Sequence, residues 1–250
     1  KTTTVANLGT ALSLENKKTV VVDADIGLRN LDVVMGLENR IVYDIVDVVE
    51  GTCKLKQALI KDKRFENLYL LPAAQTRDKN AVSVEQMSQL CEKLKESFDY
   101  IIIDCPAGIE QGFKNAIAGA DRAIVVTNPE VSAVRDADRI IGLLEANEIS
   151  DIKLIINRIR QDMVKRGDMM DKQDIVEILA IDLLGIVPDD ESIIISTNKG
   201  EPAILDPKSN AGRAYKNIAQ RILGKDVPLM EVEQETNFFS KIKKMFGVAK

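Results

Sequence analysis

The 250-residue sequence contains no histidine and no tryptophan, and aromatic residues make up only 4% of it. Without histidine, the chain cannot build imidazole metal sites or the Ser-His and Cys-His pairs of many hydrolases. Its three cysteines, Cys53, Cys91 and Cys105, are far apart and have no C-x-x-C spacing. This argues against a disulfide framework or a zinc site and is typical of a reducing compartment. No apolar run approaches the ~20 residues that a membrane-spanning helix needs.

The charge is unevenly distributed along the chain. The formal net charge of −5 argues against general affinity for nucleic acid. Residues 237–250 contain four lysines and no acidic residue, so the preceding 236 residues carry 30 basic and 39 acidic side chains. A basic tail therefore follows an acidic body.

Short apolar, β-branched segments alternate with amphipathic ones, which predicts a doubly wound, mostly parallel α/β sheet. The predicted strands lie within residues 18–25, 68–73, 100–106, 122–128, 152–158 and 183–190. The predicted helices lie near residues 3–15, 83–97, 110–119, 132–147, 171–181 and 209–223. We expect one domain over residues 1–226, with ligands bound at the carboxyl ends of the strands.

Acidic residues end two of these strands. "VVVDAD" places Asp23 and Asp25 at one strand end, and "IIIDCPAG" places Asp104 at another, before a turn with Gly108. Such an aspartate can orient the Mg²⁺ shell of a nucleotide hydrolase, or it can simply cap the next turn. For Asp23 alone we prefer the capping interpretation. For Asp25 and Asp104 the functional one is favoured by the opening residues of the chain.

The chain opens with "KTTTVANLG", an apolar-periodic helix that follows Lys1, Thr2 and Thr3. A lysine and a hydroxyl residue at a helix start form the second half of a phosphate-binding loop, where they contact phosphates and Mg²⁺. Alone, these residues would equally fit a plain helix start. Together with the strand-end aspartates, they indicate a nucleotide site.

Longer stretches resemble the ParA/MinD family of deviant Walker A P-loop ATPases, and within it the branch that selects the division site. They are "KTTTVANLG", "VVVDADIGLRNLDVVMGL", "YDIVDVVEG", "NLYLLPAAQTRDK", "IIIDCPAGIEQG", "TNPEVSAVRDADRIIGLL" and "RGDMM". The family's loop reads G-K-G-G-x-G-K-T after a central strand, whereas this chain starts at the final K-T. We therefore expect an N-terminally truncated copy that binds ATP poorly as it stands.

The resemblance implies roles for individual residues. The implied ATP and magnesium ligands at the phosphate end are Lys1, Thr2, Thr3, Asp25, Asn30, Asp104 and Gly108. Lys1, Asp25 and Asp104 would be catalytic, with Asp25 positioning the attacking water. Thr2, Asp25 and Asp104 would hold Mg²⁺, partly through water. The implied adenine-binding residues are Asn157, Arg158 and Pro188, and the implied dimer and partner surface comprises Glu130, Ser132, Asp136 and Asp138.

The last residues differ in character from the rest of the chain. Residues 227–236 read as an acidic linker, and residues 237–250 as an amphipathic helix. On a helical projection Phe238, Phe239, Ile242, Met245 and Phe246 share one arc, while Lys243 and Lys244 lie on the other side. This pattern favours an interfacial helix on anionic lipid over a helix docked on the body.

The resemblance implies an ATPase that uses ATP and Mg²⁺, forms a homodimer in ATP and binds the inner face of the cell membrane from the cytoplasm. It would recruit the division inhibitor MinC to select the septum site, with MinE as an activator of hydrolysis and no specific nucleic acid. A flagellar-placement ATPase of the same group remains an alternative. A ParA-type DNA-partition ATPase would need a basic face, and a nitrogenase-reductase-like enzyme would need cluster cysteines. A non-enzymatic tether also remains open for the chain as it stands.

Overall fold

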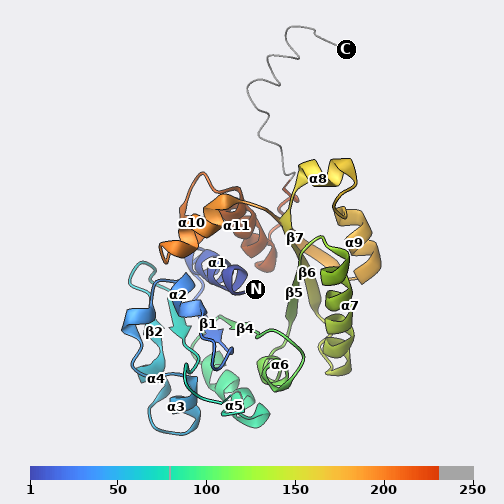
Figure 1. The fold of residues 1–250 in the computed structure, drawn as a ribbon. Helices are drawn as coiled ribbons and strands as arrows, with labels where there is room; N and C mark the ends of the chain where they lie inside the picture. The colour runs from blue at the N-terminus through green and yellow to red at the C-terminus, as the bar shows by residue number, and fades with distance from the viewer. Residues whose placement is uncertain (79, 231–250) are drawn as a thin grey trace, which may run out of the picture.

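The computed structural model describes residues 1–78 and 80–230, which form an α/β fold with two hydrogen-bonded sheets (Figure 1). The first sheet has the order β2-β3-β1-β4 and the second the order β5-β6-β7. The strands are β1 (Thr19–Asp23), β2 (Ile60–Lys61), β3 (Leu68–Leu71), β4 (Tyr100–Asp104), β5 (Ala123–Thr127), β6 (Ile152–Ile159) and β7 (Asp182–Pro188). All pairs are parallel except β2–β3. The predicted, mostly parallel α/β fold is therefore confirmed, but the sheet is divided and the edge strand β2 was not predicted.

The six predicted helices are present. They are α1 (Thr2–Leu14), α5 (Val84–Lys95), α6 (Gln111–Ile117), α7 (Val131–Ala146), α9 (Lys172–Leu179) and α11 (Asn210–Ile222). Shorter elements that were not predicted are α2 (Leu31–Val34), η1 (Glu38–Arg40), α3 (Ile45–Val49), α4 (Leu55–Ala58), α8 (Gln161–Arg166), α10 (Glu191–Asn198) and η2 (Ala203–Leu205). Among residues 1–78 and 80–230, no helix is both long and apolar enough to cross a membrane.

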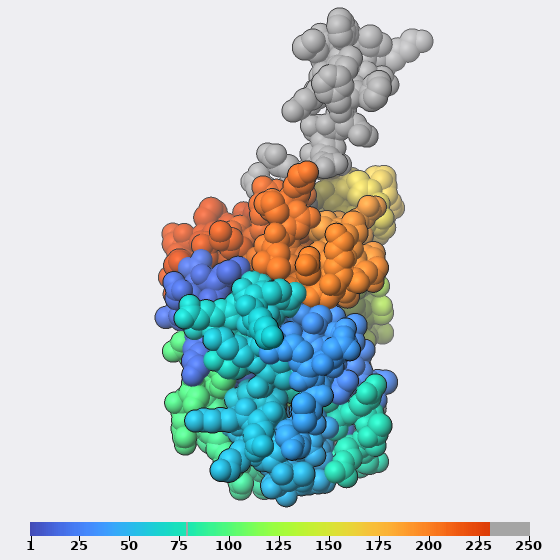
Figure 2. All heavy atoms as spheres, turned by 90° about the vertical axis from the view of Figure 1, so that its left-hand side faces the viewer, coloured from blue at the N-terminus to red at the C-terminus, as the bar shows by residue number. Residues whose placement is uncertain are grey.

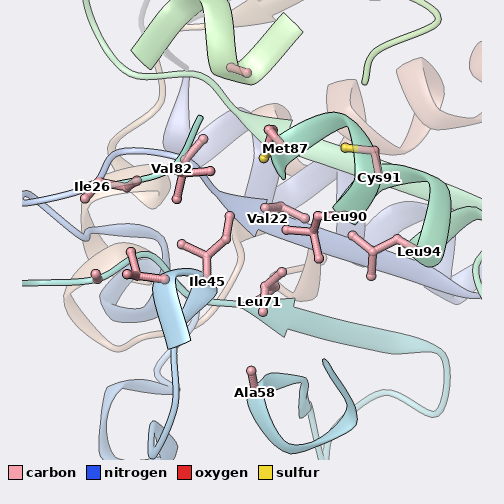
Figure 3. Close-up of a cluster of buried hydrophobic side chains, with 14 of the residues drawn as sticks. Val22, Ile26, Ile45, Ala58, Leu71, Val82, Met87, Leu90, Cys91 and Leu94 are labelled. Atoms are coloured by element: carbon pink, nitrogen blue, oxygen red, sulfur yellow. The ribbon is translucent and has the colours of Figure 1, made fainter. Parts of the chain in front are cut away.

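Helices cover both faces of the sheets, which explains the unbroken apolar runs of the strands. Successive side chains of β1 point to opposite faces. Val20 and Val22 pack with Met87 and Leu90 of α5 (Figure 3), whereas Val21 packs under α1 and α2. In the second sheet, α7 and α9 cover one face and α1 and α11 contribute to the core on the other.

The inner edges of the two sheets border a cleft of about 610 Å³. Ile101 and Ile103 of β4 and Ile124 of β5 line it, and Leu8 and Leu12 of α1 line another wall. These edge strands are less buried than the strands inside each sheet, since Ile124 is 37% exposed while Ile155 of β6 is fully buried. The chain begins beside this cleft, between the two sheets (Figure 1).

The close contact between α1 and β1 allows a test with two glycine substitutions. A Cβ on Gly9 of α1 would lie 2.4 Å from Cγ1 of Val21, whereas a Cβ on Gly142 of α7 would meet nothing within 4 Å. Since alanine favours a helix over glycine by about 1 kcal/mol, Gly142→Ala should raise the free energy of unfolding by up to that amount. Gly9→Ala should instead lower it by about 1–3 kcal/mol, because the core is overpacked. Urea denaturation measures both, and an increase in both variants would contradict this packing.

Candidate functional site

Several residues of the predicted nucleotide site lie at the carboxyl ends of β1 and β4. The two strands pair in register, so that Asp23 lies opposite Asp104, and the N–H of Ala24 donates to the carbonyl of Asp104 at 3.2 Å. Lys1, which caps α1, donates from Nζ to the carbonyl of Pro106 at 2.7 Å. The first turn of α1 therefore meets both strand ends.

Asp104 is buried at 3% exposure, nearly as deeply as Asp23 at 1%. Burial raises its pKa, while a hydrogen bond from the Thr2 side chain and the positive charge of Lys1 act in the opposite direction. Its Oδ1 atom is buried and has no hydrogen-bond partner among the described residues. A buried carboxylate oxygen without a partner is costly, and a hydrated cation or a bound water would satisfy it. This donor set, an aspartate oxygen with a threonine hydroxyl alongside, fits Mg²⁺.

Asp25 is half-buried in the loop after β1, and Asp23 holds that loop in place. The Asp23 carboxylate accepts hydrogen bonds from the backbone N–H groups of Asp25 at 3.0 Å, Asn30 at 3.2 Å and Leu31 at 3.1 Å. Burial raises the pKa of Asp23 to about 6, although these three N–H groups favour its charged form. The structure thus agrees with the capping interpretation of Asp23. Asp23 also holds the loop that carries Asp25. The sequence signal for this second role was a pair of aspartates, separated by one residue, at the end of a strand.

Residues 24–37, from the end of β1 to just beyond α2, are called the switch segment below; they contain the predicted residue Asn30 and an ion pair that was not predicted. Asn30 is exposed and precedes the first residue of α2. Arg29 forms an ion pair with the buried Asp32, with 2.9 Å between Nε and Oδ2. A buried ion pair within one segment restricts the conformations that the segment can adopt.

The turn after β4 is open to an approaching group. Gly108 is exposed at φ +92°, and a Cβ there would meet nothing within 4 Å. Such a backbone conformation strains other residues, which accounts for glycine at this position. Cys105 precedes this turn, and burial raises the pKa of its thiol to about 11. The thiol is therefore neutral at physiological pH and is not a nucleophile.

A second group of predicted residues lies at the carboxyl ends of β6 and β7. Asn157 is half-buried, and Arg158 follows it at φ +60° with its Nε 3.2 Å from Oδ1 of Asp189. Pro188, the last residue of β7, pairs with Ile159. The structure therefore joins the two predicted parts of the adenine site through the Arg158–Asp189 ion pair.

The remaining predicted residues fall into two sets. Glu130, Ser132, Asp136 and Asp138 are all exposed and lie in the N-terminal half of α7 or at its N-cap, and their role in dimer or partner contacts stays a prediction. The predicted membrane residues Phe238, Phe239, Ile242, Lys243, Lys244, Met245 and Phe246 lie outside the described residues.

Parallel strands with helices on both faces, carboxylates at two strand ends and a Lys-Thr pair at a helix start define a nucleotide hydrolase of the P-loop class. A family model described as an AAA domain matches residues 1–162. The chain is 63% identical to the septum site-determining protein MinD of Bacillus subtilis (strain 168), over 99% of this chain and 94% of the relative. It belongs to the MinD family of septum site-determining ATPases.

Solved structures agree with this assignment. In a MinC:MinD cell division protein complex of Aquifex aeolicus, a chain 49% identical to this one superposes with a TM-score of 0.86, over 92% of this chain and 93% of that one. MinD of Pyrococcus horikoshii, complexed with Mg-ADP, is 29% identical and superposes with a TM-score of 0.81, over 88% and 89% of the two chains.

The role of Asp23 in the switch segment can be tested by hydrogen exchange. In Asp23→Asn one oxygen is replaced by an amide that cannot accept, so at least one of the three backbone bonds is lost. Amide exchange at Asp25, Asn30 or Leu31 should accelerate about tenfold or more. Asp99→Asn is the matched control, because Asp99 accepts from the N–H of Lys18 at 2.7 Å near the opposite end of β4. Unchanged exchange in residues 25–31 of the Asp23 variant would contradict the role.

Proposed function

We propose that the chain, together with residues preceding Lys1, acts as an ATP-driven switch that places the division septum by cycling on and off the membrane. The observation that carries the nucleotide part is Asp104, whose buried Oδ1 is unpartnered beside the Thr2 hydroxyl. A buried carboxylate oxygen without a hydrogen-bond partner calls for an explanation, and a hydrated cation beside it is one. The same edge of the sheet carries Lys1 and Asp25.

Each residue of this group has a distinct task in the proposal. Lys1 neutralises phosphate charge, and the Thr2 hydroxyl and Asp104 hold Mg²⁺ and its water. Bound Mg²⁺ would supply positive charge that neutralises the phosphates of the nucleotide. Asp25 lies in the segment anchored by Asp23 and orients the attacking water. Asn30, in the same segment, senses the nucleotide state.

We further propose that the cleft between β4 and β5 accepts a strand. Facing edges of parallel strands leave rows of unpaired backbone groups, and one inserted strand would satisfy both rows. The cleft is apolar on the sides formed by Ile101, Ile103 and Leu8. Lys1 lies beyond the carboxyl end of β4, since its Nζ contacts Pro106. A strand running parallel to β4 would thus deliver a phosphate-binding loop next to Lys1.

In this proposal the adenine ring lies between Asn157 and the loop after β7. Asn157 has amide donors and acceptors suited to the edge of a base. Pro188 offers an apolar surface, and the ion pair between Arg158 and Asp189 links the end of β6 to this loop. Asp190, the next residue, caps α10 and also accepts from the N–H of Ala211 at 2.9 Å, which fixes the loop to the body.

Membrane binding is assigned to residues 237–250, after the acidic linker 227–236. One amphipathic tail of this length gains only a few kcal/mol from apolar side chains, plus roughly 1 kcal/mol per lysine near anionic lipid. Two tails in one ATP-bound dimer multiply the affinity through effective concentration. Nucleotide state would thereby determine membrane occupancy.

The partner proposed for the membrane-bound dimer is the division inhibitor MinC. The Aquifex aeolicus relative is described in complex with MinC, and 49% identity over most of the chain supports a shared surface. The exposed acidic positions Glu130, Asp136 and Asp138 at the start of α7 are candidates for the dimer and partner surface. MinE is proposed as an activator of hydrolysis.

The catalytic assignments can be tested in a chain extended upstream of Lys1. Asp25→Ala should retain ATP binding and lower the turnover number by about tenfold or more, because water positioning is lost while phosphate contacts remain. Lys1→Ala should weaken ATP binding as well. A normal turnover number for Asp25→Ala in the presence of liposomes would show that Asp25 is not the water-positioning residue.

The membrane assignment can be tested by liposome sedimentation with ATP. Ile242→Glu should abolish binding to anionic vesicles, because a charge at the acyl boundary costs a few kcal/mol, comparable to the gain of one tail. Lys243→Glu, the matched control, should weaken binding in a salt-dependent way only. If Ile242 instead belongs to a helix docked on the body, Ile242→Glu would lower the melting temperature and the parent would not sediment.

A further inference from the structure

The end of the switch segment touches the end of α10 through a backbone contact that leaves no room for side chains. A Cβ on Gly36 would lie 2.6 Å from the carbonyl oxygen of Gly200, and a Cβ on Gly200 would lie 2.6 Å from Cα of Gly36. Both glycines have positive φ, at +64° and +66°. In Figure 2 the orange residues of α10 lie directly against the blue and cyan residues that include α2 and β2.

Arg64 bridges this contact. Its guanidinium donates from one terminal nitrogen to the carbonyl of Gly200 at 2.9 Å, and from the other to the carbonyl of Met35. Both carbonyls follow helix ends, where backbone oxygens lack intrahelical partners and a cation is favourable. One planar side chain thus joins α2 to α10, although Arg64 and Gly200 are 136 positions apart in sequence.

Asp62 holds the guanidinium in this orientation. Its side chain is 1% exposed, and its two oxygens accept from Nε of Arg64 at 3.0 Å and from a terminal nitrogen at 2.7 Å. Oδ1 also accepts from the backbone N–H of Arg64 at 2.9 Å. A bidentate pair of this kind needs the fork of arginine and cannot be formed by lysine. Asp62 therefore fixes the orientation in which the guanidinium donates to the two carbonyls.

The two segments that Arg64 joins lead to opposite ends of the proposed nucleotide site. Met35 and Gly36 end the switch segment, which carries Asp25 and Asn30. Gly200 follows α10, whose first turn is capped by Asp190 of the loop after β7. The guanidinium thus links a segment that leads to the phosphate side with a segment that leads to the adenine side of the site.

We infer that Arg64 is a positioning residue that clasps the switch segment to α10, so that the two open and close as one unit. The effect of this contact, which we call the clasp, on catalysis rests on the proposed function. The clasp itself does not depend on nucleotide. In catalysis, the contact made by Arg64 would keep the switch segment in the position from which Asp25 orients the attacking water. Arg64 itself would not touch the nucleotide.

The clasp can be tested by hydrogen exchange on the 250-residue chain without nucleotide. Arg64→Gln removes the charge and the fork, and should accelerate exchange about tenfold in residues 31–37 and, in parallel, in residues 197–201. Arg64→Lys, which keeps one donor group and the charge, should give a smaller acceleration in both segments together. Arg122→Gln is the matched control, because Arg122, just before β5, is 73% exposed and pairs with Asp151, just before β6; it should leave both segments unchanged.

Acceleration confined to residues 60–66, or in only one of the two segments, would overturn the inference. A second readout, in the chain extended upstream, separates positioning from general destabilisation. Arg64→Gln should lower kcat about tenfold while the dissociation constant for ATP stays within about twofold. An equal loss in both would contradict positioning. If the extended chain without the substitution neither binds nor hydrolyses ATP, the proposed function fails, while the exchange experiment on the 250-residue chain still decides whether the clasp exists.

Discussion

The parallel pairing of β1 with β4 is the constraint on which the site depends. Because the two strands are in register, with Asp23 opposite Asp104, both strand ends deliver a carboxylate at one edge of the sheet. The two carboxylates then have different environments. Asp23 accepts three backbone N–H groups and organises the chain around it, whereas Asp104 keeps an oxygen free. If the pairing of β1 with β4 were shifted by one residue, every side chain of the shifted strand would face the opposite side of the sheet. One of the two carboxylates would then point into the core.

The switch segment is anchored at both of its ends. Asp23 holds its beginning by hydrogen bonds to Asp25 and Asn30, and Arg64 holds its end through Met35. Between these anchors, Arg29 and Asp32 form an ion pair. A segment held at both ends and restricted by an ion pair in between has few conformations open to it, which is compatible with a nucleotide-dependent switch between discrete positions.

Periodicity and the parallel-sheet rule were sufficient to predict most of the fold and the meeting of Asp25, Asp104 and Lys1 at one edge. Runs such as "VVVDAD" are buried on both faces of the sheet, and their apolar pattern can be recognised from neighbouring residues alone. The elements α2 and β2 were not predicted because four and two residues are too short to show a period. The helix α10 was not predicted because its three isoleucines are consecutive and so do not form one apolar face. Arg64 had no distinguishing signal, since its contacts depend on residues far away in sequence. The division into two sheets likewise depends on nonlocal pairing.

The central claim is that the strand ends beside the cleft form a nucleotide site completed by a strand and loop in that cleft. Titration calorimetry with Mg-ATP on the 250-residue chain and on a chain extended upstream of Lys1 tests it most directly. Backbone amides that bind phosphate contribute about 1.5–3 kcal/mol each, so the extended chain should bind at least about a hundredfold more tightly. Equal affinity of the two chains would contradict the account.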